Sequence, residues 1–248
     1  MNEAEWLRSS EPAPMLALLE GKVSERKLRL VAVACCRRAW PNIAELTSRI
    51  AVEVAERHAD GTASDEELQN AYSNARQAAD ETNPMRPGQP MRDWDDPLTN
   101  QAQAVHYLAS ACACAAYPPG LAFAAAIEAE SDVALGVAMT QQHREGHANE
   151  ESAIADLVRD IFGNPLRPAL TVYPAWLTWQ GGTVAKLAVA AYDERRLPEG
   201  TLDPARLAVL ADALEDAGCA DAELLAHLRG PVIHVRGCWA VDLLLGKG

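Results

Sequence analysis

Aromatic side chains are scarce in this sequence of 248 residues, in which six tryptophans, five tyrosines and two phenylalanines make up only 5%. Runs of β-branched residues are also rare, and the apolar share of 49% is carried largely by alanine. Alanine has the highest helix propensity, whereas strands favour β-branched and aromatic residues. We therefore expect an all-α fold, a multi-helix bundle with at most one short strand pair, for which the extended stretch 170–173 is the candidate.

Basic residues are also in short supply. The chain has 22 Lys and Arg against 35 Asp and Glu, which gives a formal net charge of −13. Such a field repels polyanions and anionic lipid surfaces. The charge therefore argues against nucleic acid or a membrane as the main partner.

Targeting signals and a disulfide pattern are missing as well. The first ten residues, MNEAEWLRSS, lack the basic start and the apolar run of a secretory signal, and the apolar stretch 104–116 is too short to span a bilayer. The six cysteines include one adjacent pair, Cys35 and Cys36, which does not suit a disulfide framework. We expect reduced thiols and a cytoplasmic protein.

The sequence also lacks the known catalytic signatures. The sequence contains no P-loop, no G-x-G-x-x-G, no G-x-S-x-G and no H-E-x-x-H motif. No feature links a particular cysteine or histidine to a second residue as nucleophile and base. The sequence therefore supplies no catalytic residues and no dedicated cofactor site, and it favours a protein without enzymatic activity.

What is present is a series of helix signals. Ser64 followed by Glu67 forms a capping box, and Asn149 is placed to cap a helix that continues to about residue 163. Two alanine-rich segments, 97–117 and 121–142, flank a Pro-Pro-Gly turn. Because small side chains allow helices to approach closely, we expect these two segments to pack as an antiparallel hairpin.

The clearest interruption is the stretch 83–97, NPMRPGQPMRDWDDP, which holds four prolines and a glycine. Such a run is a loop or a linker between an N-terminal helical part, 1–82, and a C-terminal helical part, 98–248. We expect the parts to form one compact unit. Met85, Met91 and Trp94 would be exposed on a plain linker, so we interpret them as candidate partner-binding residues.

The C-terminal block 203–248 carries the densest signals. Asp203 and Pro204 begin a helix, and a final segment, 238–245, is apolar nearly all round and therefore buried. Four residues of types that bind zinc lie in this block, namely Cys219, His227, His234 and Cys238. Their spacing does not match a paired zinc motif. The alternative is two buried thiols and two partly exposed imidazoles.

A basic helix over residues 22–38 departs from the acidic average, since six of the 22 basic residues lie there. One interpretation is an anion or nucleic-acid site. The other is a solvated rim that balances acidic neighbours, which the overall charge favours. The residues concerned are Arg26, Lys27, Arg29, Arg37 and Arg38.

Seven blocks of the sequence are distinctive when they are taken together, namely EAEWL, RKLRLVAVACCRRAW, AVEVAERHADG, LVRDIFGNPLRP, AYDERR, LADALEDAGC and HLRGPVIHVRGCWAVDLLLGK. Together they resemble an uncharacterised protein family that occurs in many copies in planctomycete bacteria. They cover both ends of the chain, while residues 62–150 match poorly. The segment ADALEDAG is also similar to part of the short repeat-companion domain found beside repeat proteins in those organisms. The resemblance implies a cytoplasmic, mostly helical protein and supplies no catalytic residues.

Three functional hypotheses follow. The first is a protein–protein interaction or adapter module whose partner is a genomically adjacent protein or another copy of the chain. The second is a zinc-binding protein that uses the C-terminal cysteines and histidines. The third is anion or nucleic-acid binding through the basic helix.

Overall fold

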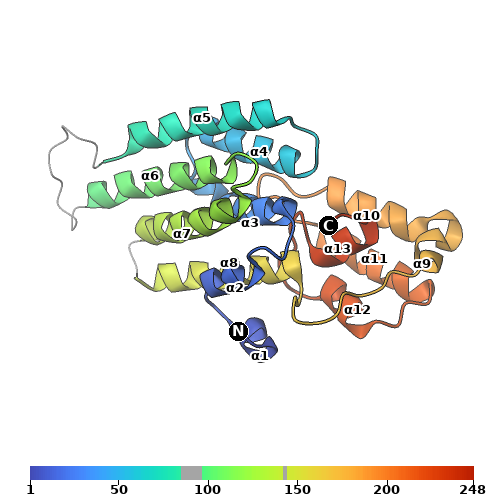
Figure 1. The fold of residues 1–248 in the computed structure, drawn as a ribbon. Coiled ribbons are helices and arrows are strands. Elements are labelled where there is room, and N and C mark those ends of the chain that lie inside the picture. Colours follow the sequence, from blue (N-terminus) through green and yellow to red (C-terminus); the bar gives the residue numbers. More distant parts are fainter. Residues whose placement is uncertain (85–96, 142–143) are drawn as a thin grey trace. The chain divides into compact units, whose positions relative to one another are not determined.

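The computed structural model describes residues 1–84, 97–141 and 144–248 (Figure 1). Within these ranges the chain forms thirteen α-helices and two 3₁₀ turns and contains no strand, so the expected all-α bundle is confirmed. The chain divides into two compact units, one formed by residues 8–155 with Met1 and the other by residues 156–248 with residues 2–7. Helix α8 (Arg144–Phe162) contributes to both. No helix in the described ranges combines the length and the apolar character needed to cross a bilayer.

The first unit is organised around α3 (Glu25–Arg38), which begins at the capping residue Ser24 and is buried at ten consecutive positions from Leu28 to Arg37. It packs against α4, α6 and α7, and α5 packs against α4 and α6. The predicted capping box of Ser64 and Glu67 is present at the start of α5. The other helices of this unit are α2 (Pro12–Leu19), α4 (Leu46–Ala59), α5 (Asp65–Thr82), α6 (Pro97–Ala115) and α7 (Ala122–Gln141).

Helices α6 and α7 form the expected alanine-rich hairpin (Figure 1). They lie very close together at Gly136 of α7. A Cβ atom at this position would lie 2.8 Å from Leu108 Cγ and 3.3 Å from the carbonyl oxygen of Ala104, both on α6. The absence of a side chain at Gly136 therefore sets the distance between the two helices.

The second unit packs the C-terminal helices around an apolar core to which α10, α11, α12 and α13 all contribute. The side chain of Asp203 caps α11 by accepting from the backbone N–H of Ala205. Helix α13 is largely buried, as its apolar sequence predicts. The helices of this unit are α1 (Glu3–Arg8), the end of α8, α9 (Pro174–Thr178), α10 (Thr183–Asp193), α11 (Pro204–Asp216), α12 (Ala222–Arg229) and α13 (Trp239–Leu245).

Two predictions of local structure are wrong. Helix α8 begins at Arg144, so Asn149 lies inside the helix and does not cap it. Gly146 is tolerated because it lies in the first turn, where the backbone N–H groups have no helical partners to lose. Residues 170–173 are extended but pair with no strand among the described residues, because Leu170 and Val172 pack against the helical core of the second unit.

We expect Gly136→Val to lower the free energy of unfolding by about 2–3 kcal/mol, because the new side chain cannot fit beside Leu108 without moving α6. Ser131→Val is the matched control, since Ser131 is exposed on the same helix. Urea denaturation followed by circular dichroism measures both variants. Equal losses in the two variants would show that helix propensity, and not the close packing, is the cause.

Glu130 of α7 is only 4% exposed. Burial, with the nearby charge of Glu151, raises the pKa of its carboxyl from 4.5 to about 7. The folded protein therefore keeps this proton where the unfolded chain has released it, and the stability should fall as the pH rises from 4.5 to 7.

We expect Glu130→Gln to remove this loss of stability with rising pH. Above pH 7 the variant should be more stable than the wild type by an amount on the order of 2 kcal/mol. Urea denaturation at a series of pH values measures the difference. Glu66→Gln, an exposed site on α5, is the control and should follow the wild-type profile. A constant difference between wild type and Glu130→Gln across this range would contradict the assignment.

Candidate metal centre

Asp160 lies in the last turns of α8 and is a buried carboxylate of the second unit, with a side chain that is 1% exposed. Its Oδ2 accepts a hydrogen bond from the backbone N–H of Val235 at 2.8 Å, and its Oδ1 lies 2.7 Å from His234 Nδ1 and 3.2 Å from His227 Nε2. Burial disfavours the charged form, but the two imidazoles outweigh it and lower the pKa of Asp160. The carboxylate is therefore held ionised although its side chain is almost completely buried.

Three segments bring their side chains to this carboxylate. His227 is in the last turn of α12, His234 is in the connector that follows, and Cys238 is the residue before α13. Backbone contacts hold the connector at His234 and at the residue that follows it. The His234 carbonyl accepts from the N–H of Leu202 at 2.8 Å, and Val235 forms an isolated bridge with Thr201.

The four side chains converge on one point. Each of Asp160, His227, His234 and Cys238 offers a ligand atom, and all four atoms lie within 4.8 Å of one another. His227 Nε2 is 3.3 Å and His234 Nδ1 is 3.7 Å from Cys238 Sγ. Asp160, His234 and Cys238 are buried, and the side chain of His227 is 16% exposed.

Three of these distances are close to the edges of a zinc tetrahedron. Bonds of about 2.0–2.1 Å to N and O and about 2.3 Å to S place neighbouring N and O ligands about 3.3 Å apart and N and S ligands about 3.6 Å apart. The distances from His227 Nε2 to Asp160 and Cys238, and from His234 Nδ1 to Cys238, are 3.2, 3.3 and 3.7 Å. The 2.7 Å pair of Asp160 and His234 would have to open by about 0.6 Å.

The surroundings hold the two imidazoles in place. The rings of His227 and His234 meet edge to face with centroids 4.7 Å apart, and the Trp239 ring lies 4.9 Å from His227. Within the described residues, His234 Nε2 is buried without a hydrogen-bond partner, so Nδ1 is the nitrogen that serves the cluster. Burial, and then the charge of Asp160, raises the pKa of Cys238 well above its usual value.

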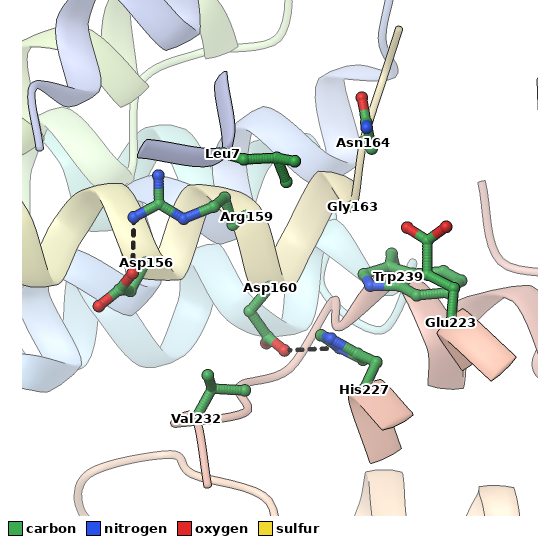
Figure 2. Close-up of a pocket in the computed structure, with 10 residues that line it drawn as sticks. All are labelled: Leu7, Asp156, Arg159, Asp160, Gly163, Asn164, Glu223, His227, Val232 and Trp239. Atoms are coloured by element: carbon green, nitrogen blue, oxygen red, sulfur yellow. Dashed lines mark hydrogen bonds and ion pairs between the residues drawn. The ribbon is translucent and has the colours of Figure 1, made fainter. Parts of the chain in front are cut away.

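A pocket of about 200 Å³ opens beside the cluster (Figure 2). Asp160 and His227 contribute to its lining, together with Leu7 of α1, Val232 of the connector and Trp239 of α13. Gly163, at the end of α8 with φ of +63°, also lines it, and a Cβ there would lie 3.1 Å from the Trp239 ring. The pocket thus gives access to one side of the Asp160–His227 pair.

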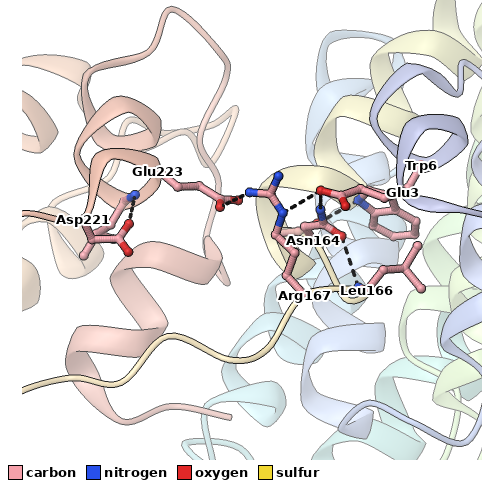
Figure 3. Close-up of polar contacts among 9 residues, drawn as sticks. Glu3, Trp6, Asn164, Leu166, Arg167, Asp221 and Glu223 are labelled. Carbon is pink, nitrogen blue, oxygen red and sulfur yellow. Dashed lines mark hydrogen bonds and ion pairs between the residues drawn. The ribbon is translucent and has the colours of Figure 1, made fainter.

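Helix α1 is fastened to the same region by polar contacts (Figure 3). The indole N–H of Trp6 donates to the Gly163 carbonyl at 2.8 Å. Arg167 lies 2.6 Å from Glu3 of α1 and 2.5 Å from Glu223 of α12, and Glu223 lines the pocket. The N-terminal segment thereby forms part of the pocket wall.

Of the four cysteines and histidines predicted as metal ligands, the structure brings together His227, His234 and Cys238. Cys219 lies elsewhere, in the apolar core of the second unit, just after α11. Asp160 takes the fourth position and is absent from the predicted set. The signal that could have identified it is weak. Asp160 is three residues after Leu157 and next to Ile161, which places an acidic residue at the flank of the apolar face of α8.

The cations of the basic helix are engaged within the first unit. Arg29 is buried and donates to the carbonyls of Ala115 and Tyr117, and burial lowers its pKa. The other three arginines form ion pairs, Arg26 with Asp60, Arg37 with Glu56 and Arg38 with Glu150. These contacts give the arginines a structural role, and anion binding through them and Lys27 stays a prediction.

The candidate partner-binding residues Met85, Met91 and Trp94 lie outside the residues that the structure describes. Their role in binding a protein partner stays a prediction.

We expect Gly163→Ala to be less stable than the wild type by about 2–3 kcal/mol, because it adds a left-handed alanine and a methyl group against the Trp239 ring. Gly246→Ala is the control, since Gly246 has a φ of +65° and no atom lies within 4 Å of the place its new methyl group would take. Thermal unfolding compares the two. If Gly246→Ala loses as much stability as Gly163→Ala, the Trp239 indole is not a fixed wall.

No protein-family model matches the chain, and neither the curated proteins nor the solved structures give a significant match. The resemblance to the planctomycete family therefore stays a prediction. The case for a functional site rests on the geometry of Asp160, His227, His234 and Cys238.

Proposed function

We propose that this chain is a metal-binding protein and that zinc is bound by Asp160, His227, His234 and Cys238. The observation that carries the proposal is the convergence of four ligand atoms within 4.8 Å of one another in a largely buried position. One carboxylate, two imidazoles and one thiol make a mixed N, O and S set. Calcium and magnesium prefer oxygen ligands alone, whereas zinc takes N, S and O ligands in a tetrahedron.

Charge supports the same metal. A carboxylate and a thiolate together carry two negative charges, which a divalent ion neutralises. Although the pKa of Cys238 is raised without a metal, coordination to zinc deprotonates a thiol outright. A neutral, four-coordinate site is the form in which a buried ion is least costly.

The metal would act as a cross-link. Asp160 belongs to α8, His227 to α12, and Cys238 begins α13. The short connector that carries His234 has few apolar anchors, since Val232 and Ile233 are 44% and 50% exposed. A bound ion would fix this connector and join the three helices, and its binding free energy would add to the stability of the second unit.

The protein–protein interaction or adapter hypothesis is compatible with this proposal. An interaction module of this size gains from a metal that fixes its shape, and the candidate contact residues lie in a different part of the chain. The two hypotheses therefore need separate experiments.

We expect purified protein to contain about one zinc per chain by elemental analysis, either as isolated or after chelation and return of zinc. Cys238→Ser and His227→Ala should lose most of the metal. Cys219→Ser is the matched control, because Cys219 is a buried thiol outside the cluster and should leave the metal content unchanged. Metal far below one equivalent in the reconstituted wild type, or equal loss in the control, would contradict the proposal.

A further inference from the structure

The pocket beside the cluster reaches two of the four proposed ligands. Asp160 and His227 line it, while His234 and Cys238 are absent from its lining and are buried. A molecule that approaches the bound metal from solvent through this pocket therefore meets it between the Asp160 and His227 side chains (Figure 2). This is the side on which a fifth coordination position would open.

The geometry of Asp160 allows such a position. Its Oδ2 is held by the backbone N–H of Val235, so Oδ1 alone faces the other ligand atoms. A carboxylate anchored in this way would hold a metal through Oδ1 alone. Zinc in catalytic sites sometimes expands from four ligands to five, and an external ligand would take such a fifth position here.

The walls of the pocket define what fits. Leu7, Val232 and the Trp239 ring are apolar, and a volume of about 200 Å³ compares with the roughly 150 Å³ of a cavity that binds benzene. The charged residues at its edge are already paired, Arg159 with Asp156 and Glu223 with Arg167. The pocket therefore offers apolar surface and no strong net charge apart from the metal.

We propose that the pocket binds a small aromatic or branched aliphatic molecule that has one anionic, metal-ligating end group. The end group binds the metal between Asp160 and His227, and the apolar body lies against Leu7, Val232 and Trp239. This inference rests on the proposed metal site and adds to it a ligand class and a route of entry.

The test uses the full chain loaded with Co²⁺ in place of zinc, because cobalt reports its ligands by its visible spectrum. The probe is benzohydroxamate, which has a ring and one chelating head, and acetohydroxamate is the matched probe without the ring. We expect benzohydroxamate to change the cobalt d–d bands at saturation without removing the metal. Acetohydroxamate should bind about tenfold more weakly or worse, because it lacks the apolar body.

Two variants locate the binding. Val232→Trp fills the pocket and should weaken benzohydroxamate binding by about tenfold or more. Ile233→Trp is the control, since Ile233 is the exposed neighbour that is not part of the pocket lining. Circular dichroism verifies that both variants are folded, and the thiolate-to-cobalt band verifies that both are loaded.

The outcomes separate the two proposals. Three outcomes overturn the pocket inference and leave the metal site standing, provided that the thiolate-to-cobalt band is present. They are no response to benzohydroxamate, equal binding of the two probes, and equal binding of benzohydroxamate to both variants. Loss of cobalt to the probe also overturns the inference. Absence of the thiolate-to-cobalt band in the wild type overturns the metal site, and the pocket inference with it.

Discussion

The second unit depends on one buried carboxylate. Asp160 is 1% exposed, and each of its oxygens has a partner from a segment at least 67 residues further along the chain, from His227 to Val235. An ionised group in such a place is costly unless it is paired and hydrogen-bonded. Helix α12, the connector and α13 lie against the end of α8 in positions that satisfy this requirement.

The apolar packing around it follows the composition of the chain. With few large aromatic side chains, the helices pack through alanine, leucine and valine, and the few tryptophans take special positions. Trp6 is fully buried and donates to the Gly163 carbonyl, and Trp239 packs on both His227 and the space above Gly163. Glycine at position 163 allows the Trp239 indole to lie this close to the backbone of α8. The same contact therefore forms the end of the helix and a wall of the pocket.

Local structure could be predicted where a few adjacent residues determine it. The capping box of Ser64 and Glu67 and the capping of α11 by Asp203 are interactions within three residues, and both are present. The start of α8 could not be placed, because Asn149 is a favoured capping residue, yet the residues before it continue the helix and leave it in the interior. Nearby residues determine whether a capping interaction forms, whereas packing determines where a helix such as α8 begins.

The candidate site shows the same limit. His227, His234 and Cys238 could be singled out because they lie within one short block of sequence, and the fold brings them together. Cys219 is equally near in sequence, but it follows α11 and is turned into the apolar core. Asp160 could not be found, because nothing in LVRDIF distinguishes it from an acidic residue at the flank of a helix. Its role depends on a contact between distant segments, which spacing does not reveal.

Charge gives a further reason to associate this group with a metal. Without an ion, the cluster places Asp160, whose pKa is lowered, beside Cys238, whose pKa is raised by burial and by that same carboxylate. A divalent ion would instead be balanced by the carboxylate and the thiolate together and would leave both imidazoles neutral, the state in which histidine binds metals. The second arrangement uses all four side chains, whereas the first gives Cys238 only weak hydrogen bonds.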